Sequence, residues 1–237
     1  MPGRRTYDGR GDPGDTLMPP PAVTGIDLYW LPLGAGGHSV RLNGKVFEAV
    51  EACLEGRDRR DLYHSALQVQ VPDGRYVIEQ APAWSDGAGR GVVAEGSVGT
   101  HAAGRFRLFR YEVRRWRDGV IPDLAEAVES PRRLSDDPES ARRLLELVPV
   151  APTPVWGRDE LGAGEMWNSN SLISWLIART GLAVQSIRPP CGGRAPGWQA
   201  GIVIADRQQA RDGEPRSASP TPSPSAEPIL FTRGDVR

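Results

Sequence analysis

The sequence predicts an α+β domain built from an antiparallel sheet with flanking helices. Three observations lead to this class. Short runs of alternating apolar and polar residues, typical of strands, recur between residues 26 and 116. The segment Pro72-Asp73-Gly74 joins two such runs and has the composition of a hairpin turn. Helical patterns are grouped at the two ends of the strand region, which favours an α+β arrangement.

Strands are expected at residues 26–31, 39–42, 62–71, 76–80, 91–93 and 108–116, with a closing strand at 199–205. One helix is expected at 45–55, where apolar residues recur with a helical period. A second runs from Pro138, which suits a first helical turn, to Leu147. A third begins among four small polar residues at 168–171 and ends at Gly181, a natural C-terminal stop.

Composition excludes several classes of protein. The 237 residues carry a net charge of −1, which gives no bulk attraction to nucleic acid or to anionic lipid. Two cysteines, Cys53 and Cys191, argue against a disulfide scaffold, and no cysteine–histidine cluster has metal-site spacing, so no metal or cofactor is expected. No apolar run approaches the about 18 residues that cross a bilayer, and the amino terminus lacks the apolar core of a signal peptide. We therefore expect a cytoplasmic protein without a transmembrane segment.

Both ends of the chain differ in composition from its middle. Residues 1–23 are rich in glycine, proline, arginine and aspartate, and 207–237 form a tail whose first part, to residue 228, is rich in serine and proline. Such segments bury too little apolar surface to fold, so both are expected to be disordered. The folded domain is then expected to span residues 24–206.

The helix expected to end at Gly181 begins with an unusual polar cluster. Asn168, Ser169, Asn170 and Ser171 are all good N-cap residues, and apolar side chains follow them. A helix N-terminus carries partial positive charge and unpaired N–H groups, so it can activate a nucleophile or hold an oxyanion. The alternative is a well-capped helix of the core with no chemical role.

His64 is the histidine best placed to act as a base. Alternation along the strand at 62–71 puts Leu67 and Val69 on one face and His64 with Gln68 on the other. His64 therefore lies apart from the apolar face, which weakens its interpretation as a core residue. An exposed histidine on a strand remains the alternative.

The turn at 72–74 decides which residue of the return strand accompanies His64. A type I turn followed by a bulge places Gln80 opposite Ala66, on the face of His64 and one diagonal step away. A two-residue turn instead places Glu79 on that face. Both remain candidates for orienting the imidazole, and the bulged turn with Gln80 is preferred on geometry.

Four short motifs bear a resemblance to a known family. They are Tyr-His-Ser-Ala-Leu-Gln-Val at 63–69, Tyr-Val-Ile-Glu-Gln-Ala at 76–81, Asn-Ser-Leu-Ile at 170–173 and Ala-Pro-Gly-Trp at 195–198. In this order they resemble the circularly permuted papain-like domains, which include relatives of NlpC-type peptidases and the lecithin:retinol acyltransferase-like proteins. The resemblance spans residues 62–198. One departure matters: Ser171 stands where the family has its cysteine nucleophile.

The resemblance implies an amide or ester hydrolase or an acyltransferase. In this hypothesis Ser171 attacks the substrate and His64 is the general base. Gln80 or Glu79 orients His64, and Glu79 is the residue that matches the family motif. The site would be completed by the helix start and its covering loop, with Asn170, Asn168 and Trp198. The substrate would be a small molecule, a peptide or a lipid, and no nucleic acid partner is expected.

Two alternatives stand beside this hypothesis. A serine needs a well-placed base that a thiolate does not, so the chain can equally be an inactive papain-like domain that binds a partner. A weaker alternative is a structural protein whose Ser-Pro tail recruits partners or is phosphorylated. A loop anchored in the core by Trp198 is likewise favoured over a substrate lid.

Overall fold

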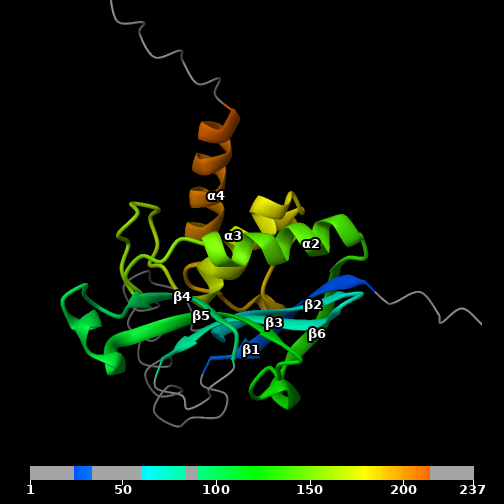
Figure 1. Cartoon of the computed structure of the whole chain (residues 1–237), viewed down its shortest axis with the longest axis horizontal. Helices are drawn as coiled ribbons and strands as arrows, with labels where there is room; N and C mark the ends of the chain where they lie inside the picture. Colours follow the sequence, from blue (N-terminus) through cyan, green and yellow to red (C-terminus); the bar gives the residue numbers. More distant parts are fainter. Residues whose placement is uncertain (1–23, 34–59, 84–89, 214–237) are drawn as a thin grey trace, which may run out of the picture.

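The computed structural model describes residues 24–33, 60–83 and 90–213, which form one antiparallel sheet with three helices on one of its faces (Figure 1). This confirms the predicted α+β class. The sheet has six strands in the order β4-β5-β3-β2-β1-β6, and all five strand pairings are antiparallel. The strand expected at 39–42, the helix at 45–55 and residues 1–23 lie outside the described residues.

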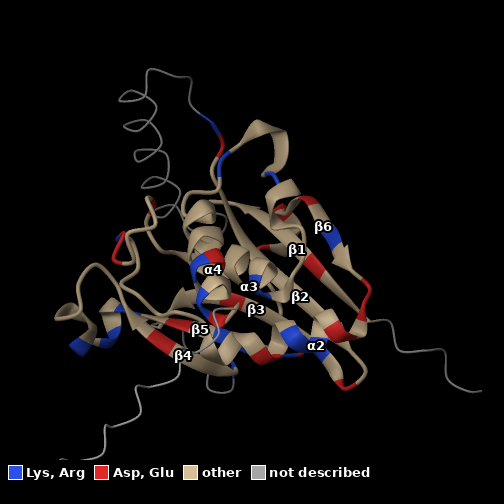
Figure 2. Cartoon of the chain, turned by 90° about the horizontal axis from the view of Figure 1, so that it is seen from above, with Lys and Arg blue, Asp and Glu red and all other residues tan. Residues whose placement is uncertain are grey.

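The strands come first along the described chain. They are β1 (Gly25–Pro32), β2 (Tyr63–Val71), β3 (Gly74–Pro82), β4 (Val92–Ser97), β5 (Arg110–Arg117) and β6 (Val128–Ser135). The helices follow as α2 (Pro138–Leu147), α3 (Ser169–Thr180) and α4 (Trp198–Gly213), with short 3₁₀ turns between elements. Figure 2, which looks down on the helices, shows them lying over the sheet.

The two internal helices form where their capping residues predict. The side chain of Asp137 caps α2 by accepting from the Ser140 N–H, and proline occupies the first turn. Gly181 ends α3 in the left-handed conformation, at φ 90°, which glycine adopts without strain. Both helices are therefore set by local sequence.

Two elements differ from the prediction. The segment 199–205 was expected to be a strand, but it lies within helix α4, which buries Ala200, Gly201, Ile204 and Ala205 against its neighbours. A short apolar run has no clear period, and packing decides its form. Helix α4 continues to Gly213, so residues 207–213 belong to the domain rather than to a disordered tail; 214–237 lie outside the described residues. Strand β6 was not predicted.

The β2–β3 hairpin has a two-residue turn instead of the preferred bulged one. Val71 pairs with Gly74, which leaves Pro72 and Asp73 as the turn. Two contacts hold it there: the Tyr76 hydroxyl donates to the Asp73 carboxylate at 2.9 Å, and the Arg117 guanidinium donates to the Asp73 carbonyl. These contacts come from outside the turn, so turn composition alone did not reveal the register.

The sheet carries a different apolar core on each face. The larger core lies between the helices and the sheet and includes Leu67, Val69 and Ile78. The smaller one is on the opposite face, where Ile121, from the connection between β5 and β6, packs with a few strand residues. Those strand residues are Tyr29, Leu31, Ala66 and Val77. Neighbouring residues of each strand therefore point into different cores.

Helices α3 and α4 approach each other closely at one glycine. A Cβ atom on Gly201 would overlap the backbone carbonyl oxygen of Ser171 and the Ser174 hydroxyl. The contact continues along the pair, where the Trp175 indole N–H donates to Gln208 at 2.8 Å and Arg179 pairs with Asp212 at 2.8 Å. None of the helices in the described ranges has both the length and the hydropathy of a membrane span.

We predict that Gly201→Ala lowers the free energy of unfolding by about 1–3 kcal/mol, because the added methyl group must push the two helices apart. Gly213→Ala is the matched control, since a Cβ there meets nothing within 4 Å. Urea denaturation of both variants measures the effect. Equal stability of the two variants would show that α3 and α4 are not packed as described.

Candidate functional site

The polar cluster at the start of α3 is a complete capping box. The Asn168 side chain accepts from the N–H groups of Asn170, at 2.9 Å, and Ser171, at 3.3 Å. In return, the Ser171 hydroxyl oxygen accepts from the Asn168 N–H at 3.1 Å. Ser171 also donates its hydroxyl proton, with the Gly197 carbonyl oxygen as the nearest acceptor at 2.7 Å. The side chain of Ser171 is fully buried, so its hydrogen-bonding capacity serves the fold.

Asn170 joins the helix to the sheet. Its carboxamide oxygen accepts from the Ser65 hydroxyl on β2 at 2.9 Å, and its NH₂ group donates to the Tyr63 carbonyl and to the Pro196 carbonyl, each at 3.0 Å. Asn168 donates to the same Pro196 carbonyl at 2.8 Å. Two asparagines therefore connect the start of α3, strand β2 and the segment that precedes α4.

The segment before α4 approaches this cluster through a glycine. Gly197 has φ 82°, and a Cβ there would lie 2.6 Å from the Asn168 carboxamide oxygen and 2.7 Å from the Ser171 hydroxyl. Trp198, the next residue, is partly buried, and its ring lies 5.0 Å from that of Trp30. These contacts anchor the loop on the core, which is the arrangement that the sequence favours over a substrate lid.

His64 lies on the other face of the sheet from Ser171. It pairs with Leu31 of β1 and is two residues from Ala66, and both of these belong to the small core opposite the helices. Its neighbour Ser65 is the residue that faces α3. The predicted proximity of His64 and Ser171 is therefore wrong, because the strand alternation that separates His64 from the apolar face also separates it from the helix.

His64 is neutral at physiological pH. Burial lowers its pKa from 6.5 to about 4, because the charged imidazolium is poorly solvated there; the carboxylate of Asp123 acts weakly in the opposite direction. The histidine is thus a partly buried residue of the second sheet face.

Glu79 and Gln80 each lie on the sheet face opposite to the one that the preferred bulged turn predicts. With the two-residue turn, Glu79 shares the face of His64, whereas Gln80 points toward the helices. The preference for Gln80 as partner of His64 is corrected accordingly. Gln80 is buried, and neither atom of its amide has a hydrogen-bond partner in the described part of the chain. Continuing the β2–β3 register places it opposite Ser65.

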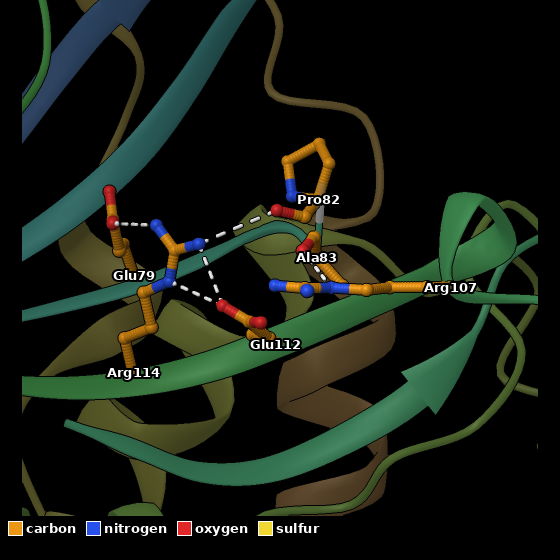
Figure 3. A network of polar contacts seen from close by, with 6 residues as sticks. All are labelled: Glu79, Pro82, Ala83, Arg107, Glu112 and Arg114. Carbon is orange, nitrogen blue, oxygen red and sulfur yellow. Dashed lines mark hydrogen bonds and ion pairs between the residues drawn. The ribbon is translucent and has the colours of Figure 1, made fainter. Parts of the chain in front are cut away.

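Glu79 is part of a buried charge network that the sequence analysis missed (Figure 3). Arg114, only 1% exposed, lies between two carboxylates on this sheet face. Its Nη1 donates to Glu79 at 3.0 Å, and its Nε and Nη2 donate to one oxygen of Glu112 at 2.9 and 2.7 Å. Arg107 lies beside the network and donates to the Ala83 carbonyl at 3.0 Å. The sequence carries one sign of this network, because strand alternation in β5 puts residues 112 and 114 on the same face of the sheet.

Within residues 24–33, 60–83 and 90–213, histidine, cysteine, aspartate and glutamate form no group of three or more that could hold a metal ion. Comparisons with protein-family models, with curated proteins and with solved structures found no match. The functional interpretation therefore depends on the geometry of the chain itself.

We predict that Arg114→Met lowers the free energy of unfolding by about 3–5 kcal/mol, because it leaves two buried carboxylates without their counter-charge. Arg142→Met is the control: Arg142 pairs with Glu139 at 2.7 Å on the exposed surface of α2, so its loss should barely change the urea midpoint. Adding Glu79→Gln and Glu112→Gln to Arg114→Met should restore part of the loss. Equal midpoints for the two arginine variants would show that the buried network contributes no stability.

We predict that His64 makes the fold acid-sensitive. The pKa of His64 is lower in the folded chain than in the unfolded chain, so protonation favours unfolding. The free energy of unfolding therefore has its full value above pH 6.5 and decreases as the pH falls toward about 4. The loss is at most ~3 kcal/mol. Measured by denaturation across this range, His64→Gln should flatten the pH dependence, whereas His101→Gln, at an exposed site, should retain it. Identical pH profiles for wild type and His64→Gln would contradict a buried neutral imidazole.

Proposed function

We propose that this chain is a binding or interaction domain of papain-like type without catalytic activity. The observation that carries this proposal is the position of Ser171, whose buried hydroxyl donates its proton to a backbone carbonyl and, among the described residues, has no histidine as a hydrogen-bond partner. A serine nucleophile needs a general base within hydrogen-bond reach. Here the nearest polar groups are backbone carbonyls and the capping asparagine.

The polar side chains that meet at the start of α3 also support the absence of catalytic activity. In a papain-like site, a nucleophile at a helix start faces polar residues on two neighbouring strands. At the start of α3 the polar side chains that meet are those of Asn170 and of Ser65 on β2, which donates to it, and the continued β2–β3 register places Gln80 opposite Ser65. A carboxamide, a hydroxyl and a second carboxamide provide neither a thiolate nor a base that titrates near neutral pH.

The same groups are suited to holding a scaffold in place. The bonds of Asn170 and Asn168 fix α3 against β2 and against Pro196. A rigid scaffold with exposed loops is the usual basis of a binding module. The hydrolase hypothesis would instead require His64 to lie on the helix-facing side of β2.

We predict that the thiol of Ser171→Cys, in a background with Cys53→Ser and Cys191→Ser, reacts slowly with iodoacetamide. Its pKa should lie above the ordinary value of about 8.5, because burial and hydrogen bonds to carbonyl oxygens both favour the neutral thiol. Ser140→Cys is the matched control, since Ser140 occupies the equivalent position in the first turn of α2 but is not fully buried. Alkylation rates measured against pH separate the two.

Adding His64→Ala should leave the titration of the thiol at position 171 unchanged. A fluorophosphonate probe, which labels activated serines, should likewise not label the wild-type protein. A depressed thiol pKa that rises when His64 is removed, or labelling at Ser171, would show an assembled dyad and refute the interaction-domain proposal.

A further inference from the structure

Three large apolar side chains are exposed within four consecutive residues. In the connection between β4 and β5, Phe106 is 65% exposed, Leu108 59% and Phe109 43%. They lie in and beside two 3₁₀ turns, Ala103–Arg105 and Arg107–Phe109, neither of which has a buried residue. Other exposed apolar side chains of the described chain are separate from one another in sequence. Large apolar groups gathered in this way mark a contact surface.

Arginines alternate with these apolar residues. Arg105 and Arg107 are exposed, and each is anchored through its Nε, which donates to the Ala102 carbonyl and to the Ala83 carbonyl, respectively. Neither pairs with a carboxylate of the described chain. Arg110 pairs with Glu95 at 3.3 Å. The three arginines and this glutamate leave an excess of two positive charges on the segment, although the whole chain has a net charge of −1.

The segment lies at one edge of the described domain, beyond the ends of β4 and β5, at the left in Figures 1 and 2. The segment is short, so the area that it can bury against a partner is small. A stable protein interface usually buries about 800 Å² on each partner, which is more than a few side chains supply. Binding to a membrane requires a smaller buried area. Apolar side chains enter the headgroup region, and arginines bind the phosphates of lipids and the carboxylates of phosphatidylserine headgroups.

We propose that the segment Arg105–Arg110 is a membrane-contact loop that binds anionic phospholipid. Phe106, Leu108 and Phe109 enter the boundary between headgroups and acyl chains, and Arg105 and Arg107 bind the anionic headgroups. This role concerns a surface away from the start of α3, so it is independent of whether that helix carries chemistry.

The test is sedimentation of the full-length chain with vesicles of phosphatidylserine and phosphatidylcholine in equal parts, compared with phosphatidylcholine alone. Wild type should sediment with the anionic vesicles only, and less so as salt increases. Phe106→Ser with Phe109→Ser, and separately Arg105→Gln with Arg107→Gln, should each lower the partition coefficient roughly tenfold or more. Unchanged thermal unfolding of each double variant confirms that the fold is intact.

Matched controls change the same chemistry elsewhere. Val120→Ser with Val150→Ser removes two exposed apolar side chains, and Arg142→Gln with Arg143→Gln removes two exposed arginines; both should bind vesicles like wild type. Absence of wild-type binding, or equal binding by loop and control variants, overturns the proposal. Retention on heparin without vesicle binding also overturns it, since the partner would then be an acidic macromolecule.

Discussion

The buried first turn of α3 imposes the constraint on which the rest of the domain depends. A helix start leaves backbone N–H groups without partners inside the helix, and here water does not reach them freely. Asn168 and Ser171 satisfy them, and Asn170 extends the network to Ser65 and to the Pro196 carbonyl. Because the Pro196 and Gly197 carbonyls are fixed in this way, the path of the chain into α4 is fixed as well.

A hydroxyl that satisfies a fold in this manner is a poor reagent. Moving the Ser171 proton to a base would break its bond to the Gly197 carbonyl, which ties the start of α3 to the start of α4. The polar residues that make the helix start look reactive are the ones that hold it in place. The polar atoms that catalysis would require at this helix start are the same ones that stabilise the fold, and here they make the stabilising hydrogen bonds.

The sequence predicted the elements that local signals determine and failed where distant contacts decide. Helices α2 and α3 follow from capping residues and Gly181, and five of the six strands from alternation. Strand β6 owes its form to pairing with β1, about a hundred residues earlier, as in the bond from the Trp30 N–H to Ser130. The hairpin turn is contacted by Arg117 of β5, about forty residues later in the chain, and its register differs by one residue from the preferred one, which exchanges the faces of Glu79 and Gln80. The net charge of −1 likewise hid a locally basic, apolar loop.

The order of elements has a consequence for synthesis of the protein. The three helices that cover the larger core, α2, α3 and α4, all follow β6 in the chain. When β6 leaves the ribosome, Leu67, Val69 and Ile78 still lack the helices that bury them. At roughly 5–20 residues per second, translation through the end of α4 takes further seconds. During that interval the nascent chain presents an uncovered apolar sheet face, which is a substrate for chaperones that bind exposed hydrophobic segments.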